Sequence, residues 1–599
     1  MVAAPLVGAY ALVDMVGGRR RRTRLVFAAT ALVVAALPLS SVHADELSGL
    51  SSQPVRAGGE DFVAPPPTPR AECGAGSRPA PGLQGRVTAE APDAGYTCNT
   101  ELVGHQGTTG GFKVERFVDE AGHRCLYYDT SLIFPFQALE QSIGNGSPGV
   151  AVVDVSDPTR PTRTETLVTP AMQSPHESLL VNQKRGLLAA VLGGETTRPG
   201  VFDIYDVKGD CRHPQLLASA PVGLLGHESG WAPDGNTFYA TSLFTGTITA
   251  VDVSDPRAPV PVAEFRNPSH GFTVSDDGNR GYAAGLQSGL IVVDTSEIQA
   301  RKPAPEVREV SRLRWPTLSI PQVALPVRFG GRPHLIEVDE FSVDSDEDIL
   351  PTSNGRRVGA ARIIDISDER APEVISDIRL EVHQPEHREE IGGDPGAQFI
   401  GQGYGAHYCN VPREDNPTLV ACASILSGLR VFDIRDLRRP REVAYFVAPP
   451  EPGPVLADGG PRSNYAMSKP AFDVDRRIVW YSDINSGLYG VRLTNGAWPS
   501  GVSERRLQLS VRPARVTTGC HRFRFRATTQ AGSRRREVRS VIVTFGHQRA
   551  RTNRRGYASM SRCLRRPGRY RARARKSGFR GAAARVRAAR IAADPQFTG

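Results

Sequence analysis

The stretch "GVAVVDVSDPTRP", residues 149–161, decides the fold because variants of it recur along the chain. The related segments begin at 201 ("VFDIYDVKGD"), 248 ("ITAVDVSDPRAPV"), 290 ("LIVVDTSEI"), 361 ("ARIIDISDERAPE"), 429 ("LRVFDIRDLRRPRE") and 487 ("GLYGVRLTNG"). Each copy combines a short apolar run with a turn. Six of the seven end the run with an Asp, and the last carries Arg492 at that place.

A run that is apolar on both faces predicts a strand covered on both sides. The following Asp and Pro favour a turn, because Asp bonds to its own backbone and Pro fixes φ, and a second Pro restricts the next strand to a sheet edge. Another turn and strand precede most copies, as in "SDDGNRGYAAGLQSG" at 275–289. Four short strands repeated about seven times predict an all-β chain with a seven-bladed β-propeller over residues 98–500. A linear β-solenoid is the alternative, although its repeats are shorter.

The copies "LIVVDTSE" and "VAVVDVSDPTRP" closely resemble the LVIVD repeat of secreted bacterial and archaeal β-propeller proteins. The resemblance covers residues 98 to about 495. It implies the propeller fold, but it implies no single activity, so function has to be argued from the residues of a site.

The two ends of the chain differ from the repeats in composition. Residues 1–44 hold a basic cluster, an apolar run and Val-His-Ala, which predicts a secretory signal peptide cleaved after Ala44. A start at Met15 would put the basic cluster at its usual place. The Pro- and Gly-rich segment 45–97 predicts a disordered linker. We therefore expect a secreted or envelope-associated protein with no transmembrane segment in the mature chain.

Residues 505–592 switch to strict alternation of Arg with apolar residues, as in "HRFRFRA", which predicts a strand with arginines facing solvent. The segment resembles bacterial Ig-like, or carboxypeptidase-regulatory-like, β-sandwiches in its turn glycines and its "RPGRYRA" strand. From 501 onward 26 Arg and one Lys stand against three acidic residues, although the whole chain is only +10. Such a face suits polyanions such as envelope polymers, whereas a GC-rich genome would also favour Arg over Lys. Specific nucleic-acid binding is not expected.

Eight cysteines in an exported chain predict disulfides. Cys409 and Cys422 flank one expected hairpin, and Cys520 and Cys563 are the two cysteines of the C-terminal segment, so we expect both pairs to be bridged. The sequence leaves open how the other four pair, namely Cys73, Cys98, Cys125 and Cys211.

Histidines precede the paired strands of most repeats. Six share this place: His105, His176, His227, His270, His334 and His407. The seventh repeat has Ser468 and Lys469 there instead. If each repeat is a blade, the six side chains converge on the channel, where imidazoles could hold Zn, Cu or Fe, with Glu177 and Glu228 as outer-shell acceptors and Lys469 in the seventh place. Alternatively, the histidines hydrogen-bond neighbouring backbone and persist from duplication of one unit.

Two functions follow from these alternatives. The first is a non-enzymatic binding or adhesion protein of the cell envelope, whose partner is a polymer, a protein or a small ligand. The second is a metal-dependent, oxidase-like enzyme with its centre at the histidine ring. A channel ring of histidines resembles carotenoid oxygenases and selenium-binding or methanethiol oxidase proteins in architecture alone, so no residue role carries over. The sequence does not decide whether the chain is an enzyme, nor its oligomeric state.

Overall fold

The computed structural model describes residues 63–130, 149–192, 200–222, 226–243, 245–286, 289–317, 319–342, 357–398, 402–453, 461–499, 507–531, 534–576 and 579–590. The expected signal peptide, residues 1–44, lies outside these ranges, as does the first part of the expected linker, up to residue 62. Within the described residues, no helix is both long and apolar enough to cross a membrane.

Seven antiparallel sheets of four or five strands make up most of the described chain between residues 96 and 493. We number them in chain order. Sheet 1 contains β3 (Val114–Val118), β4 (Arg124–Asp129), β5 (Val150–Asp154) and β6 (Thr162–Leu167). Sheet 2 contains β7 (Leu180–Asn182), β8 (Leu187–Val191), β9 (Val201–Asp206) and β10 (Gln215–Pro221). Sheet 3 contains β11 (Gly230–Trp231), β12 (Thr237–Ser242), β13 (Thr247–Asp252) and β14 (Val260–Arg266).

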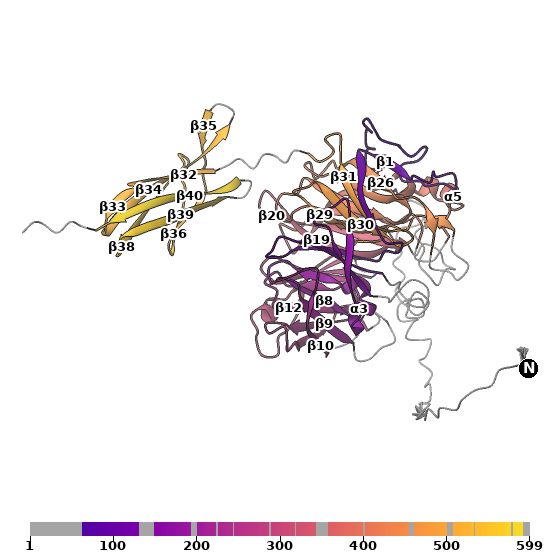
Figure 1. Ribbon diagram of the computed structural model, residues 1–599, viewed down its shortest axis with the longest axis horizontal. Coiled ribbons are helices and arrows are strands. Elements are labelled where there is room, and N and C mark those ends of the chain that lie inside the picture. Colours follow the sequence, from indigo (N-terminus) through magenta and orange to yellow (C-terminus); the bar gives the residue numbers. More distant parts are fainter. Residues whose placement is uncertain are drawn as a thin grey trace, which may run out of the picture. The chain divides into compact units, whose positions relative to one another are not determined.

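The later sheets have the same sequential order, except that β1 and β2 join the last two of them. Figure 1 shows β1 beside β26. Sheet 4 contains β15 (Gly271–Val274), β16 (Arg280–Gly285), β17 (Gly289–Asp294) and β18 (Arg308–Leu313). Sheet 5 contains β19 (Ser319–Phe329), β20 (Arg332–Ser342), β21 (Ala361–Asp365) and β22 (Glu373–Ile378). Sheet 6 contains β23 (Ala406–Asn410), β24 (Leu419–Ser424), β25 (Gly428–Asp433), β26 (Arg441–Val447) and β1 (Tyr96–Cys98). Sheet 7 contains β29 (Ala471–Asp473), β30 (Ile478–Asp483), β31 (Gly487–Leu493) and β2 (Thr100–Gln106).

Short elements connect the sheets. A two-stranded ribbon consists of β27 (Glu451–Pro452) and β28 (Arg462–Ser463). The helices within the described residues each have one turn; they are α3 (Pro170–Gln173), η1 (His176–Ser178), α4 (Ser296–Gln299), η2 (Glu381–His383), η3 (Pro385–His387), α5 (Arg388–Ile391) and η4 (Ile425–Ser427). This part of the chain is therefore built mainly of β-sheets and is propeller-like; it is called the propeller-like region below.

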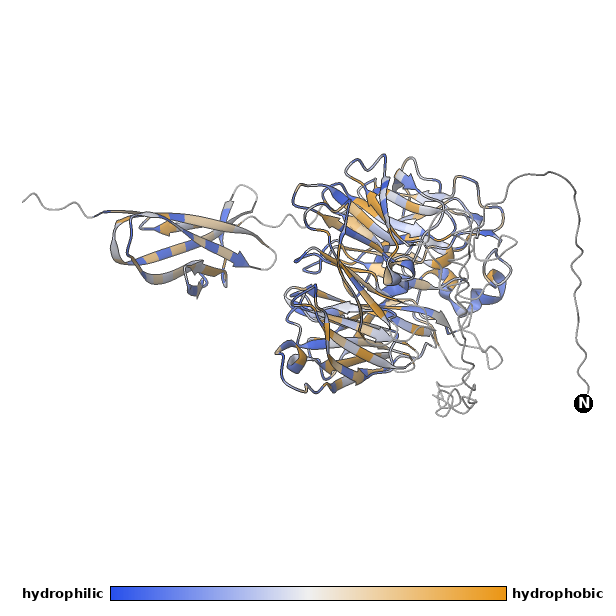
Figure 2. Ribbon diagram, turned by 60° about the horizontal axis from the view of Figure 1, so that its bottom comes forward, coloured by the Kyte–Doolittle hydropathy of each residue, from blue (hydrophilic) through white to orange (hydrophobic). Residues whose placement is uncertain are grey.

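Each copy of the repeat forms the third strand of its sheet. These strands are buried on both faces, as the apolar runs predict, and β5 leaves only its terminal Asp154 partly exposed. Figure 2 shows hydrophobic, orange segments along the strands of this region. The turn then leads to the fourth strand, and all seven pairings of third and fourth strands contain a register shift. A bulge bends the outer strand and increases its twist.

The fourth strand of sheet 7 comes from the other end of this region. Strand β2 pairs with β31, so that Thr100 lies opposite Leu493 and Gln106 opposite Leu488. Residues near 100 and near 490 thereby form one sheet. Such pairing joins the first and last parts of a repeat array and removes an open edge.

The expected linker requires a correction, because residues 63–95 pack on the propeller-like region. The Thr68 N–H donates to the Arg379 carbonyl at 2.9 Å, and the Arg86 guanidinium pairs with Asp394 at 2.9 Å. Val87 and Ala91 are buried. The Pro- and Gly-rich composition removes regular secondary structure, but here ion pairs and a disulfide hold the segment in place, so composition alone misjudges its order.

Four disulfides join all eight cysteines. Cys409 bonds to Cys422 between β23 and β24, and Cys520 bonds to Cys563 in the C-terminal region, the two pairs expected from the sequence. The pairs that the sequence left open are Cys73–Cys98, which ties the N-terminal segment to β1 of sheet 6, and Cys125–Cys211, which links sheet 1 to the chain after β9.

The C-terminal region forms two further sheets. One contains β32 (Leu507–Arg512), β34 (Gly519–Ala531), β35 (Arg534–Glu537) and β38 (Tyr557–Leu564). The other contains β33 (Arg515–Thr517), β40 (Phe579–Ala589), β39 (Gly568–Lys576), β36 (Ile542–Phe545) and β37 (Gln548–Arg551). The alternation seen in the sequence puts Phe523, Phe525 and Phe545 in their shared core, whereas the intervening arginines are exposed.

Candidate metal centre

Four histidines, each in or shortly before the first strand of a different sheet, meet in the interior. His176 lies in η1 before β7, His227 and His270 lie directly before or near the first strands β11 and β15, and His407 lies in β23. All four are at most 8% exposed. The ring centroids of His176 and His227 are 4.4 Å apart, and those of His227 and His270 are 4.3 Å apart. The Nε2 atoms of His227 and His270 approach to 2.9 Å.

Two buried carboxylates lie among these imidazoles. Glu177 Oε2 is 3.3 Å from His227 Nε2 and 3.7 Å from His270 Nε2, and Glu177 Oε1 is 3.0 Å from His407 Nε2. Glu340, at the end of β20, lies 3.3 Å from His270 Nε2 and 2.9 Å from His407 Nε2. Within the described residues, Glu177 Oε2 accepts no hydrogen bond, although it is buried.

The donors form two overlapping groups that share Glu177, namely His176–Glu177–His227 and Glu177–Glu340–His407, and within each group the ligand atoms lie within 4.8 Å of one another. Metal–nitrogen bonds of about 2.1 Å separate adjacent ligands by about 3.0 Å at right angles and by about 3.4 Å in a tetrahedron. The donor atoms of His227, His270, His407 and the two glutamates are 2.9 to 3.7 Å from their neighbours. His176 Nε2 lies 4.0 Å from Glu177 Oε2, at the edge of the group. Imidazole and carboxylate together suit a divalent transition metal such as Fe, Zn or Cu.

The charges of the cluster depend on burial and on these contacts. Burial lowers the pKa of His176 to about 4, and burial with the charge of His270 lowers the pKa of His227. Burial also disfavours charged His407, but hydrogen bonds to Glu177 and Glu340 outweigh it and raise its pKa to about 10. Burial acts in the same way on His270, and there too Glu340 and Glu177 outweigh it and raise the pKa. The contacts with Glu177 and Glu340 thus favour the charged forms of His270 and His407.

Local backbone geometry aims these side chains. His176 has φ +47°, a left-handed conformation that costs a non-glycine residue of order 1 kcal/mol. It belongs to the one-turn helix that places His176 and Glu177, adjacent in sequence, in the same cluster. Gly271, after His270, has no room for a side chain, because a Cβ there would lie 2.3 Å from the Gln322 carbonyl oxygen. His407 Nδ1 donates to the Met467 carbonyl at 2.6 Å, which leaves Nε2 facing the carboxylates.

The remaining two histidines of the expected ring lie elsewhere. His105 is in β2, the fourth strand of sheet 7, where its Nε2 contacts the Ser486 carbonyl at 2.7 Å. His334 is in β20, the second strand of sheet 5, where its Nδ1 contacts the Arg332 carbonyl at 3.1 Å. The expectation of six histidines at one channel mouth therefore requires correction for these two, because they occupy different strands of their sheets.

Other residues occupy their places in the cluster. Phe112 packs against His176, with ring centroids 4.5 Å apart, and the Gln322 side-chain amide donates to Glu177 at 2.6 Å. Ser468, expected at the seventh place, is buried and accepts a hydrogen bond from the Ser482 N–H. Lys469 pairs with Glu115 at 2.8 Å rather than with the cluster.

A second buried layer follows the histidines by one residue. Glu228 pairs with Lys113, whose Nζ lies 2.7 Å from Oε2, and it also accepts a hydrogen bond from the Tyr408 hydroxyl. Lys113 and Tyr408 are at most 1% exposed. Burial raises the pKa of Glu228, and the charge of Lys113 counteracts this. Glu228, expected as a histidine partner, thus serves a separate ion pair.

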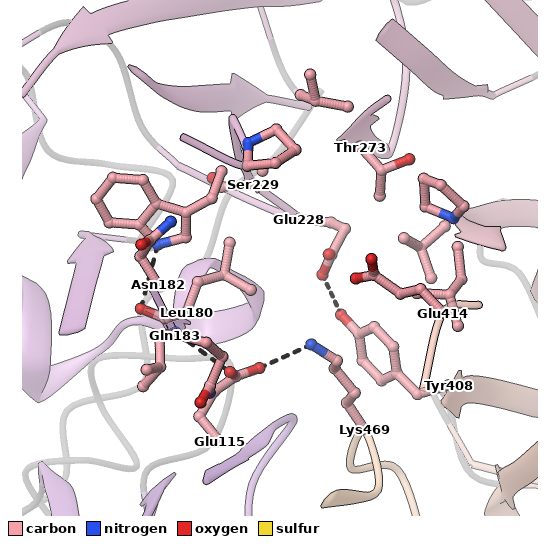
Figure 3. Close-up of a pocket in the computed structure, with 18 of the residues that line it drawn as sticks. Glu115, Leu180, Asn182, Gln183, Glu228, Ser229, Thr273, Tyr408, Glu414 and Lys469 are labelled. Atoms are coloured by element: carbon pink, nitrogen blue, oxygen red, sulfur yellow. Dashed lines mark hydrogen bonds and ion pairs between the residues drawn. The ribbon is translucent and has the colours of Figure 1, made fainter. Parts of the chain in front are cut away.

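This layer forms part of the wall of a cavity of about 340 Å³. Figure 3 shows Glu228 hydrogen-bonded to Tyr408 and Lys469 paired with Glu115, with Leu180, Ser229 and Thr273 nearby. Trp231 and Val274 add apolar surface to the lining. The cavity thus combines apolar walls with buried charges, and its volume suits a small molecule.

A second group of possible ligands, Asp119, His123 and Asp210, is already satisfied by the protein. Asp119 accepts hydrogen bonds from His123 Nδ1 at 2.8 Å and from the Cys211 N–H at 3.1 Å. Asp210 pairs with Arg212 at 2.9 Å. These bonds fix the turn beside the Cys125–Cys211 disulfide, and the group needs no ion.

Sequence reasoning missed Glu340, Gln322, Lys113 and Tyr408. Tyr408 and Lys113 carried a usable signal, since Tyr408 directly follows His407, and Lys113 forms a parallel bridge with Lys469, which has the corresponding place in the seventh repeat. Gln322 is in β19, the first strand of sheet 5, but no histidine marks it. Glu340 comes from a second strand, so the repeat pattern gives no indication of it.

Comparisons with known proteins add only similarity of fold. No protein-family model matches the chain, and no curated protein matches it. A solved protein from Lactobacillus plantarum is similar over 58% of this chain and 87% of its own, at 11% identity and a TM-score of 0.38. A putative 6-phosphogluconolactonase from Bacteroides uniformis is similar over 58% of this chain and 92% of its own, at 11% identity and a TM-score of 0.37.

Proposed function

We propose that the protein is a metalloprotein whose centre is held by His176, His227, His270 and His407. The observation that carries this proposal is the convergence of four imidazoles from four sheets, three of them with Nε2 atoms within 3.7 Å of the Glu177 carboxylate. Histidines that merely bonded to neighbouring backbone would have no reason to point their Nε2 atoms at one another. Duplication explains why histidine recurs, but not why Glu340, from outside the repeat pattern, joins the group.

The charges of the site support a divalent ion. Within the described residues, the ion pairs of Glu177 and Glu340 are all with histidines. The raised pKa values of His270 and His407 favour protonation of both beside the two carboxylates, and one divalent cation would supply the same charge. Binding of a metal would therefore release protons rather than leave a net charge in the interior.

We further propose that the centre serves a metal-dependent, oxidase-like enzyme and that the cavity beside it admits a small substrate. Glu228 and Tyr408 line the cavity and directly follow two of the four histidines. A substrate there would lie one layer of side chains from the ion. Iron and copper would support redox chemistry, whereas zinc would favour hydrolytic or structural roles. The alternative of a purely binding, envelope-associated protein remains a hypothesis for the chain as a whole.

The architecture that we propose around this centre is a ring of seven blades, one for each sheet, closed by the pairing of β2 with β31. The repeat resembles the LVIVD repeat, and the C-terminal sandwich resembles an Ig-like domain. One blade cannot bury both faces of its sheet, but seven in a ring can. Four disulfides suit an oxidising compartment and so support secretion.

The test compares two double variants in metal content. The full chain is purified after export and analysed by inductively coupled plasma mass spectrometry, before and after incubation with Fe(II), Zn(II) and Cu(II). We expect one ion per chain in the wild type and little or none in His227→Ala/His270→Ala. The matched control, His105→Ala/His334→Ala, also removes two imidazoles and should keep its metal.

Circular dichroism shows whether each variant is folded. Glu177→Gln keeps the size of the side chain, so it should weaken metal binding without creating a cavity in the interior. A wild-type chain that binds none of the three metals would overturn the proposal. So would a folded His227→Ala/His270→Ala chain with full metal content.

A further inference from the structure

The C-terminal sandwich carries a sheet face that is rich in arginine. In the sheet β33-β40-β39-β36-β37, nine exposed arginines from β33, β37, β39 and β40 lie on the face opposite the core. The register places Arg515 opposite Arg587 and Arg587 opposite Arg569, so that three guanidinium groups form one row. Arg571 lies opposite Arg585 in the next row.

These rows of like charges destabilise the fold of the sandwich when nothing is bound to it. Side chains directly opposite each other in a sheet are about 4.5–5.5 Å apart at Cβ, and like charges at that distance destabilise the pairing. Between residues 507 and 590 the sequence contains a single acidic residue, Glu537, and it pairs with Arg526 of the other sheet at 2.7 Å. Within the described residues 507–590, the face therefore has no carboxylate to neutralise it.

A general bias toward arginine does not explain the face. The propeller-like region of the same chain also uses Arg rather than Lys, but there arginines pair with carboxylates, as Arg280 does with Glu369 at 2.8 Å and Arg301 with Asp252 at 2.9 Å. Codon usage can set the choice of arginine over lysine. It does not remove acidic residues from one face.

We propose that this face binds a linear, phosphate-bearing polymer of the cell envelope. Guanidinium groups bind phosphate with two parallel hydrogen bonds, and rows of them suit a chain of repeated charges. Proteins that bind single-stranded nucleic acid stack bases on exposed aromatic rings, whereas the described outward positions beside these arginines hold residues such as Thr544 and Ile542. Ile542 is 40% exposed, and one such side chain offers too little apolar surface for the face to insert into a membrane.

The test uses the full chain and medium-length inorganic polyphosphate as the probe. Arg569→Gln/Arg571→Gln/Arg585→Gln/Arg587→Gln removes four charges from the face. The control, Arg554→Gln/Arg555→Gln/Arg565→Gln/Arg566→Gln, removes four exposed charges from the turns before β38 and β39. Binding is measured by fluorescence anisotropy over a series of salt concentrations. We expect the face variant to bind at least tenfold more weakly and its salt slope to fall by about 0.7 for each phosphate that the variant no longer neutralises.

Calorimetry of the unbound proteins separates loss of binding from loss of folding, since removal of repulsion should raise the melting temperature of the sandwich in the face variant. Three results would overturn the proposal. They are equal losses in the two variants, tighter binding to oligo(dT) of matched charge than to polyphosphate, and tighter binding to phosphatidylglycerol vesicles than to either polymer.

Discussion

Replacement of Lys113 by Met tests the buried layer beneath the cavity. Lys113 has no exposed surface, and its Nζ contacts both carboxylate oxygens of Glu228, at 2.7 and 2.8 Å. Methionine has a similar length, so the substitution removes the charge and leaves little empty space. Among the described residues, the Tyr408 hydroxyl is then the one hydrogen-bond partner left to the Glu228 carboxylate. Removal of one partner of a buried ion pair costs about 3–5 kcal/mol, and we expect that destabilisation at pH 8.

The destabilisation should depend on pH and on Glu228. As pH falls toward 5, Glu228 of the Lys113→Met variant takes up a proton, and the difference from wild type should shrink. The double variant Lys113→Met/Glu228→Gln should be more stable than Lys113→Met alone, because no charge is left unpaired. Urea unfolding followed by tryptophan fluorescence reports on the propeller-like region and not on the C-terminal sandwich, since all four tryptophans precede residue 500. A Lys113→Met chain within about 1 kcal/mol of wild type at pH 8 would refute the reasoning.

Two further predictions concern stability. Burial raises the pKa of Asp129 to about 7, so the folded chain holds a proton there that the unfolded chain releases near pH 4. The stability that this proton uptake contributes is therefore present at low pH and is lost as pH rises through 7. Relative to Asp129→Asn, the free energy of unfolding of wild type should fall by about 4 kcal/mol between pH 4 and pH 8 in urea titrations. Parallel curves of stability against pH for the two proteins would contradict this. Replacement of Cys125 and Cys211 by Ser should lower the free energy of unfolding by about 4–5 kcal/mol, and replacement of Cys409 and Cys422 by about 3 kcal/mol, because the first bridge closes a loop of 86 residues and the second a loop of 13. Equal losses of stability in guanidinium unfolding would contradict the loop-entropy argument.

The repeat predicted more of the fold than of the site. Seven apolar runs with turns indicated seven third strands, because a strand buried on both faces leaves a clear trace in the sequence. Whether a side chain reaches the centre depends on which strand of a sheet carries it. The spacing to the Asp of the repeat already hinted at this, since it is 24–27 residues for the four histidines that meet but 31 for His334 and 49 for His105. The expectation of six converging histidines did not use that difference. Glu340 and Gln322 could not be predicted, since neither belongs to a repeated pattern.

The amino-acid composition of residues 63–95 also did not predict that this segment is ordered. Prolines and glycines indicate that a chain forms no regular strand or helix, and they do not reveal long-range contacts. Arg86 meets Asp394 across 308 residues of sequence, and Gln84 donates to Glu442 across 358. Such contacts decide whether an irregular segment is fixed, and only the folded structure contains them.

Anomalous diffraction at the absorption edge of the bound metal tests the central claim most directly. Crystals of the full chain, loaded with the ion that the protein retains on purification, should give one strong peak among His176, His227, His270 and His407, about 2.0–2.2 Å from the Nε2 atoms that bind it. A peak at any other place in the protein, or none within reach of these imidazoles in fully loaded crystals, would contradict the account.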